Sequence, residues 1–129
     1  MENNFTVEII SPEKSIIKTS TNEVILPSFE GEMGILKDHI PLITFLRPGL
    51  IYIKNENERK YFVEEGTVEF SNNNLLILTS TAKELPNIDQ RTLDEIISDA
   101  KKKIGNDEVS DKEKYLLSHK IDTLKNINQ

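Results

Sequence analysis

The segment Phe5-Thr6-Val7-Glu8-Ile9 indicates the fold class of the first two thirds of this 129-residue chain. Its apolar and polar residues alternate, so Phe5, Val7 and Ile9 fall on one face of an extended strand. Similar short runs follow it, separated by breaks rich in Pro, Gly or Asn. These runs are Ser15–Lys18, Glu23–Leu26, Leu42–Leu46, Leu50–Lys54, Lys60–Glu64, Thr67–Phe70 and Leu75–Thr79. Many short strands at close spacing predict a β-sandwich or barrel over residues 1–86.

Two of these runs, Leu50–Ile53 and Leu75–Leu78, are apolar on both faces. A strand of this composition is expected to be covered on each side, by a second sheet or by a partner. The segments Asn55–Glu58 and Ser71–Asn74 are polar enough to form hairpin turns.

The period of the apolar residues becomes helical after Pro86. The residues that share one helical face are Leu93, Ile96, Ile97, Ala100 and Ile104. Thr92 and Glu95 have the spacing of a capping box, which predicts the start of this helix, and Gly105 is a natural stop.

A second capping box, formed by Ser110 and Glu113, predicts another helix, with Leu117, Ile121 and Leu124 on its apolar line. Residues 87–129 are therefore expected to form an antiparallel two-helix hairpin, which makes the chain mainly β followed by α. Isolated helices of this length are marginal in water, so the hairpin must pack on itself, on the sandwich or on a partner. We expect it to be mobile.

Composition excludes several classes of protein. The net charge of -6 and the sequence pI of about 5.0 argue against a general nucleic-acid binder, which needs clustered Lys and Arg. The chain has no cysteine and two histidines, so we expect neither a disulfide framework nor a metal site. The sequence has no stretch typical of a signal peptide or membrane span, which predicts a soluble, uncleaved protein.

The densest cluster of unusual residues is Glu30–Leu42, which contains two glycines. Its candidate acid and base groups are Glu30, Glu32, Asp38 and His39. These groups permit acid–base catalysis in principle, but no accompanying nucleophile or oxyanion site is evident. The alternative is a surface loop in which Gly31 and Gly34 adopt positive φ and the carboxylates are solvated. No Gly-Lys-Ser/Thr follows, so the glycines do not indicate a phosphate-binding loop.

Three strings in this region have a specific order and spacing. They are Glu30-Gly31-Glu32-Met33-Gly34-Ile35, Asp38-His39-Ile40-Pro41-Leu42-Ile43-Thr44 and Arg47-Pro48-Gly49-Leu50-Ile51. Together they closely resemble the central block of F-type ATP synthase epsilon subunits. The opening Phe5–Glu13 resembles the first strand and turn of that family, and Val63–Phe70 resembles a later strand pair. The resemblance spans the β half, and the helical hairpin follows in the expected order.

The resemblance implies a non-catalytic rotor subunit without cofactor or metal. Its sandwich would pack on the gamma subunit and touch the c ring, coupling proton-driven rotation to ATP synthesis. Its helices would be able to enter the catalytic alpha/beta head and restrain ATP hydrolysis. Membrane contact would occur only through the complex, on the cytoplasmic face of a bacterial inner membrane or the equivalent organelle face. The c-ring and gamma contacts implied by the family are Glu30, Gly31, Glu32, Met33, Gly34, Asp38 and His39.

The helical half departs from the members of the family that bind ATP through an Ile-Asp-x-x-Arg-Ala stretch. Here the order is Ile88-Asp89-Gln90-Arg91-Thr92, so the arginine comes one residue early, a rotation of about 100° on a helix. The second helix contains no arginine. ATP binding through Asp89 and Arg91 is therefore doubtful. The basic residues available for inhibitory contacts with the acidic head are Arg91, Lys101, Lys102, Lys103, Lys112, Lys114, Lys120 and Lys125.

Two other functions remain open at the level of sequence. The first is a free-standing β-sandwich adapter or ligand-binding module with a helical tail. The second is a small acid–base enzyme. The three hypotheses predict different companions, because only the rotor subunit should co-purify with gamma and the catalytic head.

Overall fold

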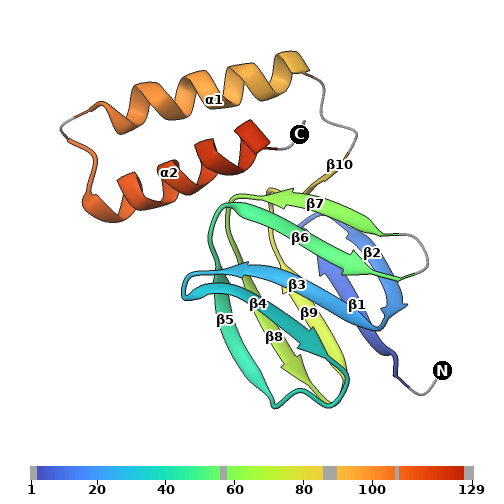
Figure 1. Ribbon diagram of the computed structural model, residues 1–129. Helices are drawn as coiled ribbons and strands as arrows, with labels where there is room; N and C mark the ends of the chain where they lie inside the picture. Colours follow the sequence, from blue (N-terminus) through green and yellow to red (C-terminus); the bar gives the residue numbers. More distant parts are fainter. Residues whose placement is uncertain (1–2, 56–57, 86–89, 107, 127–129) are drawn as a thin grey trace. The chain divides into compact units, whose positions relative to one another are not determined.

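The computed structural model describes residues 3–55, 58–85, 90–106 and 108–126 (Figure 1). The chain divides into two compact units, Met1–Leu85 and Pro86–Gln129. The first unit is built from strands and the second from helices. The predicted order of a β half followed by a two-helix half is confirmed.

The strands of the first unit are β1 (Phe5–Ile10), β2 (Ser15–Thr21), β3 (Glu23–Ser28), β4 (Gly31–Leu36), β5 (Leu42–Leu46), β6 (Gly49–Lys54), β7 (Arg59–Val63), β8 (Gly66–Ser71), β9 (Asn74–Leu78) and β10 (Lys83–Leu85). The helices of the second unit are α1 (Gln90–Ile104) and α2 (Asp111–Asn126).

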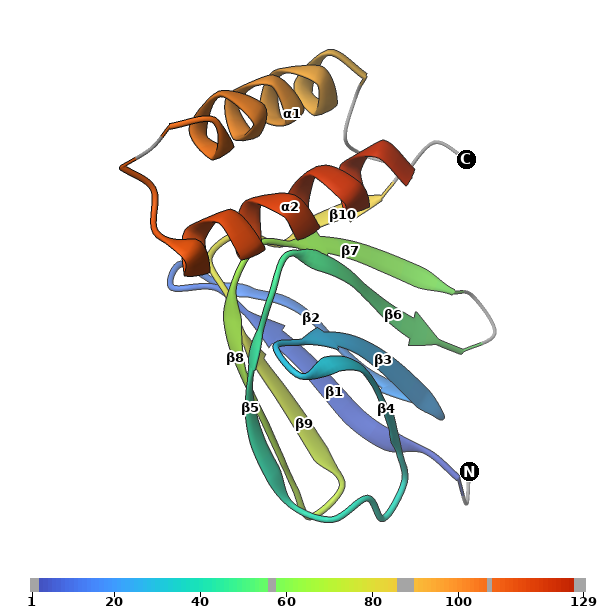
Figure 2. The ribbon, with the colours of Figure 1, turned by 60° about the vertical axis from the view of Figure 1, so that its left-hand side comes forward.

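The strands form one hydrogen-bonded sheet that folds over into two layers. Its order is β10-β7-β6-β3-β5-β8-β9-β1-β2, with β4 paired to β3. Strands β5, β8, β9, β1 and β2 make one layer, and β4, β3, β6, β7 and β10 make the other (Figures 1 and 2). The layers are linked where β3 meets β5, at the single pair Ser28 and Leu46. This arrangement is the predicted sandwich.

The core lies between the two layers. Phe5, Val7 and Ile9 are buried while their neighbours in β1 are half-buried, so the alternation read from the sequence is confirmed. The ring of Phe5 meets that of Phe70 edge to face, with centroids 5.6 Å apart. The partner strands contribute residues such as Ile51 and Ile77 to the same cluster. Most of the stability of this unit therefore comes from apolar area removed from water between the layers.

Two strands were not predicted. β4 covers Gly31–Leu36, where the sequence indicated a surface loop, and β10 is only three residues long. Gly31 does adopt a positive φ, of 132°, but Gly34 does not, so the expectation of a positive φ at Gly34 is wrong. Glycine is depleted in strands, and this hid the alternation in which Met33 and Ile35 are the more buried residues of β4.

Gly49 shows why a glycine stands after Pro48. A Cβ atom at this position would lie 2.5 Å from the Cβ of Pro27 in β3, closer than real contacts allow. We expect Gly49→Ala to lower the free energy of unfolding by roughly 1–3 kcal/mol, because the two strands must move apart. Urea denaturation of the full chain measures the loss.

Gly34→Ala is the matched control for this substitution. A Cβ atom there would lie 3.7 Å from Glu23 Oε2, an ordinary contact, and the backbone needs no positive φ. We expect a change within about 0.5 kcal/mol. Equal losses for the two alanine variants would show that crowding against Pro27 is not the reason for glycine at position 49.

The second unit is the predicted helical hairpin, and its apolar stripes are partly buried: the others of the predicted stripe residues, Ile96, Ile97, Ile104 and Leu117, are half-buried. Leu93 and Ala100 of α1 and Ile121 and Leu124 of α2 are buried, and the two helices contact each other. Neither helix is long and apolar enough to span a membrane, within the described part of the chain.

The two predicted capping boxes have different outcomes. Ser110 Oγ accepts a hydrogen bond from the N–H of Glu113 at 3.2 Å, so Ser110 caps α2 as expected. In contrast, α1 already includes Gln90, which places Thr92 inside the helix, and the predicted cap at Thr92 is wrong. The helix ends at Ile104, directly before Gly105, as predicted.

Candidate functional site

The turn between β3 and β4 carries the first group of candidate residues. Ser28 pairs with Gly31, so Phe29 and Glu30 form the tip of a tight hairpin. Ser28 Oγ donates a hydrogen bond to the carbonyl oxygen of Gly31 at 2.6 Å, which fixes the turn. Glu30 and Glu32 are exposed. This end of the sandwich therefore presents two exposed carboxylates beside the half-buried ring of Phe29.

The second group, Asp38 and His39, lies at the other end of β4. Asp38 adopts a φ of 67°, and the N–H of His39 donates to the carbonyl oxygen of Leu36 at 3.1 Å. The ring of His39 meets Phe70 edge to face, with centroids 5.9 Å apart. The two groups look adjacent in the sequence, but the six residues of β4 separate them by roughly 17 Å.

This separation argues against a single acid–base site formed by the four candidate groups. Proton transfer requires the two groups to be within hydrogen-bond reach of one substrate, or one water apart. His39 and the Glu30 tip lie at opposite ends of a strand, and the carboxylate of Asp38 accepts a hydrogen bond from Asn73. The four candidate groups therefore do not form one catalytic site.

An exposed apolar surface lies on the outward side of the layer that contains β5. In the sheet register, Phe45 is opposite Thr67 and Thr67 is opposite Leu78, while Ile43 is opposite Glu69. Cross-strand partners point to the same side of a sheet. The exposed fractions are 72% for Ile43, 59% for Phe45 and 45% for Leu78, and Ile40 in the connection before β5 is 74% exposed. We call Ile40, Ile43, Phe45 and Leu78 the outer apolar face.

The outer apolar face was missed in the sequence, although a signal for it exists. Leu42–Leu46 is apolar at Leu42, Ile43, Phe45 and Leu46, which means that both sides of the strand carry apolar residues. Leu75–Leu78 also carries apolar residues on both sides, and its sequence predicts that a second sheet or a partner covers each side. Contiguous apolar residues on the surface of a monomer are typical of interaction sites with proteins, membranes or ligands.

Electrostatics distinguish the two sides of the sandwich. Burial raises the pKa of the Tyr52 phenol, and the carboxylates of Glu32 and Glu58 raise it further. Burial also raises the pKa of Tyr61, whose hydroxyl donates to Glu84 at 3.1 Å. Both tyrosines belong to the layer that includes β4. Carboxylates therefore lie close to both tyrosines of that layer, while the outer apolar face carries Glu69 opposite Ile43.

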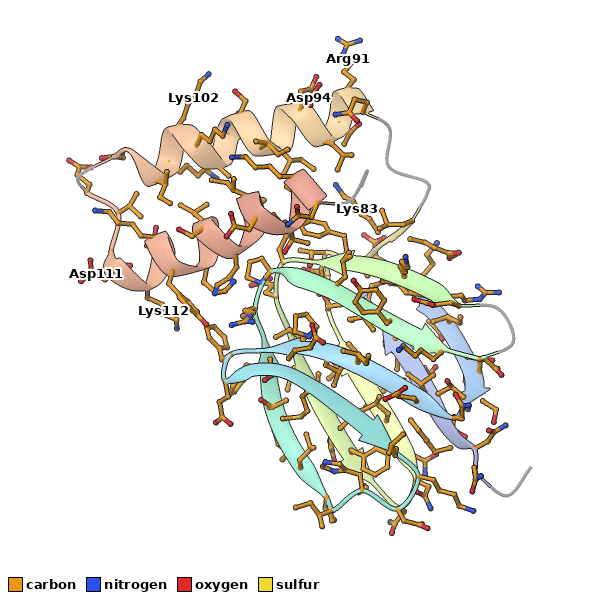
Figure 3. The ribbon with its side chains drawn as sticks, in the orientation of Figure 1. Lys83, Arg91, Asp94, Lys102, Asp111 and Lys112 are labelled. Atoms are coloured by element: carbon orange, nitrogen blue, oxygen red, sulfur yellow. The ribbon has the colours of Figure 1, made fainter. Side chains whose placement is uncertain are left out.

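The basic residues proposed for inhibitory contacts lie on both helices, and those of α1 are found at its two ends. Lys101, Lys102 and Lys103 lie together in the last turn of α1, where they also stabilise the negative end of the helix. Arg91 is at the other end of α1, and its Nε lies 3.5 Å from Glu95 Oε1. Figure 3 shows Arg91 and Lys102 projecting from the same side of α1, away from α2.

The lysines of α2 do not form a single basic face. At 100° per residue, Lys114 and Lys125 share one side of the helix, while Lys112 and Lys120 point in other directions. The basic end of α1 is thus the only contiguous basic group among the described parts of the two helices. Asp89, the other residue considered for ATP binding, lies outside the described residues.

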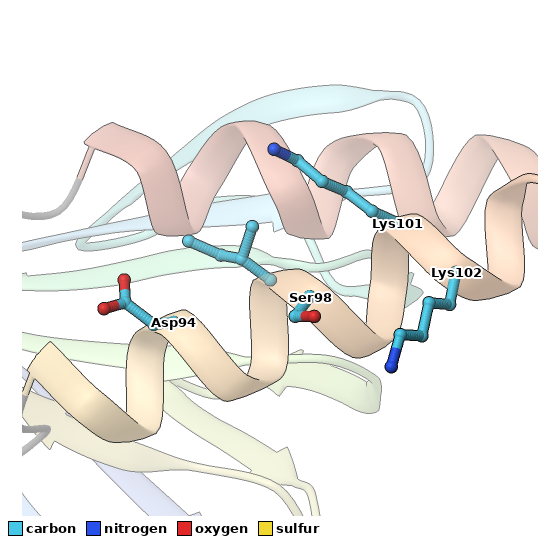
Figure 4. A pocket seen from close by; sticks show the side chains of 5 residues that line it. Asp94, Ser98, Lys101 and Lys102 are labelled. Carbon is cyan, nitrogen blue, oxygen red and sulfur yellow. The ribbon is translucent and has the colours of Figure 1, made fainter.

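A hollow on the surface of α1 is lined by Asp94, Ile97, Ser98, Lys101 and Lys102 (Figure 4). All five residues come from one helix, so the hollow is an open groove along its surface. No group of three or more carboxylates and histidines suited to a metal ion occurs in the residues that the structure describes.

Comparisons with known proteins agree with this arrangement of elements. Residues 4–85 match the family model described as ATP synthase, delta/epsilon chain, beta-sandwich domain. The ATP synthase epsilon chain of Pelagibacter ubique is 47% identical, over 99% of this chain and 100% of the relative. That of Parvibaculum lavamentivorans is 31% identical, over 98% of this chain and 97% of the relative.

Solved structures share the fold. One is a chain in the mitochondrial ATP synthase of Euglena gracilis, solved with OSCP, F1 and the c-ring. It aligns with a TM-score of 0.82 at 21% identity, and the alignment covers 98% of this chain and 82% of the Euglena chain. A chain in the central stalk and c-ring of Tetrahymena thermophila ATP synthase aligns with a TM-score of 0.61 at 12% identity, with 96% of each chain covered. The sandwich, its matched family model and the full-length identity to curated relatives together place this chain in the family of ATP synthase epsilon chains.

Proposed function

We propose that this chain is a non-catalytic subunit of the central stalk of a proton-translocating ATP synthase, where it couples rotation of the c ring through gamma to ATP synthesis. Its place among the epsilon chains supports this role. So does the likeness of its fold to chains in two ATP synthase assemblies that include the c-ring.

The observation that carries the proposal is that one sandwich offers two surfaces of different chemical character. The outer apolar face has the character of a stable protein interface, since it offers large apolar side chains at its centre. The β3–β4 turn is small, and its exposed side chains, Glu30 and Glu32, are acidic. We assign the outer apolar face and the adjoining Asp38–His39 segment to gamma, and the turn from Glu30 to Gly34 to the polar loops of the c ring.

Transmission of torque requires that the two surfaces keep a fixed distance. The well-packed core between the layers provides this rigidity, because close-packed interiors transmit strain and compress little. Strand β4 runs from the turn to the Asp38–His39 segment, and it is paired with β3 along its whole length. The Phe45 end of the outer apolar face lies beside the turn, since the N–H of Phe29 donates to the carbonyl oxygen of Phe45 at 3.1 Å.

Site-specific crosslinking tests this assignment, and the absence of cysteine from the chain provides a clean background. Cysteine is introduced singly at Glu30, at Ile40 of the outer apolar face and, as a control, at exposed Glu58, and each position is labelled with a photoreactive maleimide in the assembled complex. We expect the label at position 30 to capture c and the label at position 40 to capture gamma, because β4 separates the two positions. Capture of the same partner from both positions, or of neither partner, would contradict the assignment.

The helical hairpin has a separate proposed role, the restraint of ATP hydrolysis. The lysines at the end of α1 supply positive charge that suits the acidic segments of the catalytic head. The shift of Arg91 along the helix and the lack of arginine in α2 argue against an ATP site in this chain. The proposed location is the cytoplasmic face of a bacterial inner membrane or its organelle equivalent, with membrane contact only through the complex.

A further inference from the structure

Two turns that are far apart in the sequence are joined by reciprocal hydrogen bonds. The backbone N–H of Asp38 donates to Asn73 Oδ1 at 2.7 Å, and Asn73 Nδ2 donates to Asp38 Oδ1 at 2.9 Å. Asp38 and Asn73 both have positive φ values, 67° and 59°. Such a conformation is uncommon outside glycine and persists where the surroundings stabilise it. We call this pair the Asp38–Asn73 clamp.

The turn that contains Asn73 is itself firmly held. Asn72 and Asn73 both adopt positive φ between the paired residues Ser71 and Asn74, which is the pattern of a type I′ hairpin turn. The carbonyl oxygen of Asn73 also accepts a hydrogen bond from the N–H of Thr6 at 3.0 Å, at the start of β1. Asn73 is therefore a fixed point to which the β4–β5 connection is attached.

The clamp sits directly before the exposed part of that connection. His39 follows Asp38, and its Nδ1 lies 2.7 Å from the carbonyl oxygen of Ile40. Ile40, which belongs to the outer apolar face, is 74% exposed. An exposed loop that must be ordered on binding costs affinity, and a loop that is already ordered avoids this cost.

We propose that Asn73 is a positioning residue for the gamma contact, which pre-orders residues 37–40 through the Asp38–Asn73 clamp. This inference rests on the proposed function, because it takes the Asp38–His39 segment and the outer apolar face as the surface that gamma meets. Asn73 itself acts through Asp38.

Asn73→Gly separates positioning from stability. Glycine adopts positive φ without strain, and Asn-Gly is a favoured pair for a type I′ turn, so the more favourable turn should offset the lost side-chain hydrogen bonds and leave the Tm nearly unchanged. Both hydrogen bonds of the clamp are lost. We expect the affinity for gamma to fall about fivefold, the effect of roughly one net hydrogen bond. A purely structural role for Asn73 predicts no loss of affinity in a variant that melts normally.

A charge swap provides the rescue. Asn73→Asp places a second carboxylate beside that of Asp38 and should weaken binding about tenfold. In the double variant Asp38→Asn, Asn73→Asp, the amide and the carboxylate exchange places, so both hydrogen bonds can form again. We expect its affinity to return to within about twofold of the parent. Asn74→Ala is the control, because among the described residues Asn74 Nδ2 donates within its own turn, to the carbonyl oxygen of Asn72 at 3.1 Å.

The affinities are measured by titrating the full chain into an epsilon-depleted ATP synthase head that retains gamma. If the parent chain does not bind, the proposed function fails. If the parent binds and Asn73→Gly binds equally well, or if the swap binds as weakly as Asn73→Asp, the inference about the clamp is overturned while the proposed function stands. Weak binding by Asn73→Gly with an unchanged Tm, together with recovery in the swap, would support the clamp.

Discussion

Replacing Ile43 and Phe45 together by lysine is expected to weaken binding of the chain to gamma by more than about a hundredfold, or roughly 3 kcal/mol. Each side chain is largely exposed in the isolated chain and would be buried at the interface. The double change removes their apolar area from the contact and places two unpaired charges there. Calorimetric titration into the gamma-containing head measures the loss.

Lysine is preferred to glutamate in this experiment because Glu69 lies directly opposite Ile43. A lysine at position 43 would face an opposite charge across the strands, so the isolated sandwich should keep its stability within about 0.5 kcal/mol. Glu58→Lys, at an exposed position before β7, makes the same change in net charge outside the outer apolar face. We expect it to bind like the parent. If the double lysine variant also binds like the parent, the outer apolar face is not the gamma contact.

Ending the chain at Pro86 is expected to leave assembly intact and to raise ATP hydrolysis by the isolated head roughly threefold to tenfold, equivalent to about 1 kcal/mol of restraint. The hydrophobic core cluster lies entirely within Phe5–Ala82, so the sandwich keeps its packing without the helices. Both proposed contact surfaces also remain. The measurement is steady-state ATP hydrolysis by the head reconstituted with either the full or the shortened chain.

A charge-specific variant separates restraint by the lysines from simple loss of the hairpin. Replacing Lys101, Lys102 and Lys103 by glutamine keeps good helix-forming residues and removes the charge at the end of α1. We expect hydrolysis to rise in this variant too, by part of the effect of truncation. Unchanged hydrolysis after a truncation that still assembles would refute the inhibitory role of the hairpin.

Local patterns were sufficient to predict most of the fold. The alternation in Phe5–Ile9 and the helical spacing of Leu93 and Ala100 reflect which residues the core must bury, so they appear directly in the sequence. The family match placed Glu30 and His39 on the surface. It did not show that β4 separates them, because the glycines of that strand gave it the composition of a loop.

The features that escaped prediction depend on long-range pairing. Asn73 meets Asp38 across 35 residues of sequence, and no local pattern indicates that contact. Ile43 and Phe45 are visibly apolar, but which side of β5 faces the core depends on its pairing with β8. The start of α1 was misplaced because the Thr92–Glu95 spacing also fits the interior of a helix.

The central claim is that this chain is a rotor subunit that joins gamma to the c ring. The most direct test is to capture the tagged full chain from native membranes and to identify the proteins that come with it by mass spectrometry. We predict recovery of gamma, the catalytic subunits and the c ring in fixed proportion to the chain. Recovery of the chain without gamma and without the c ring would contradict the claim, and would favour a free-standing adapter in its place.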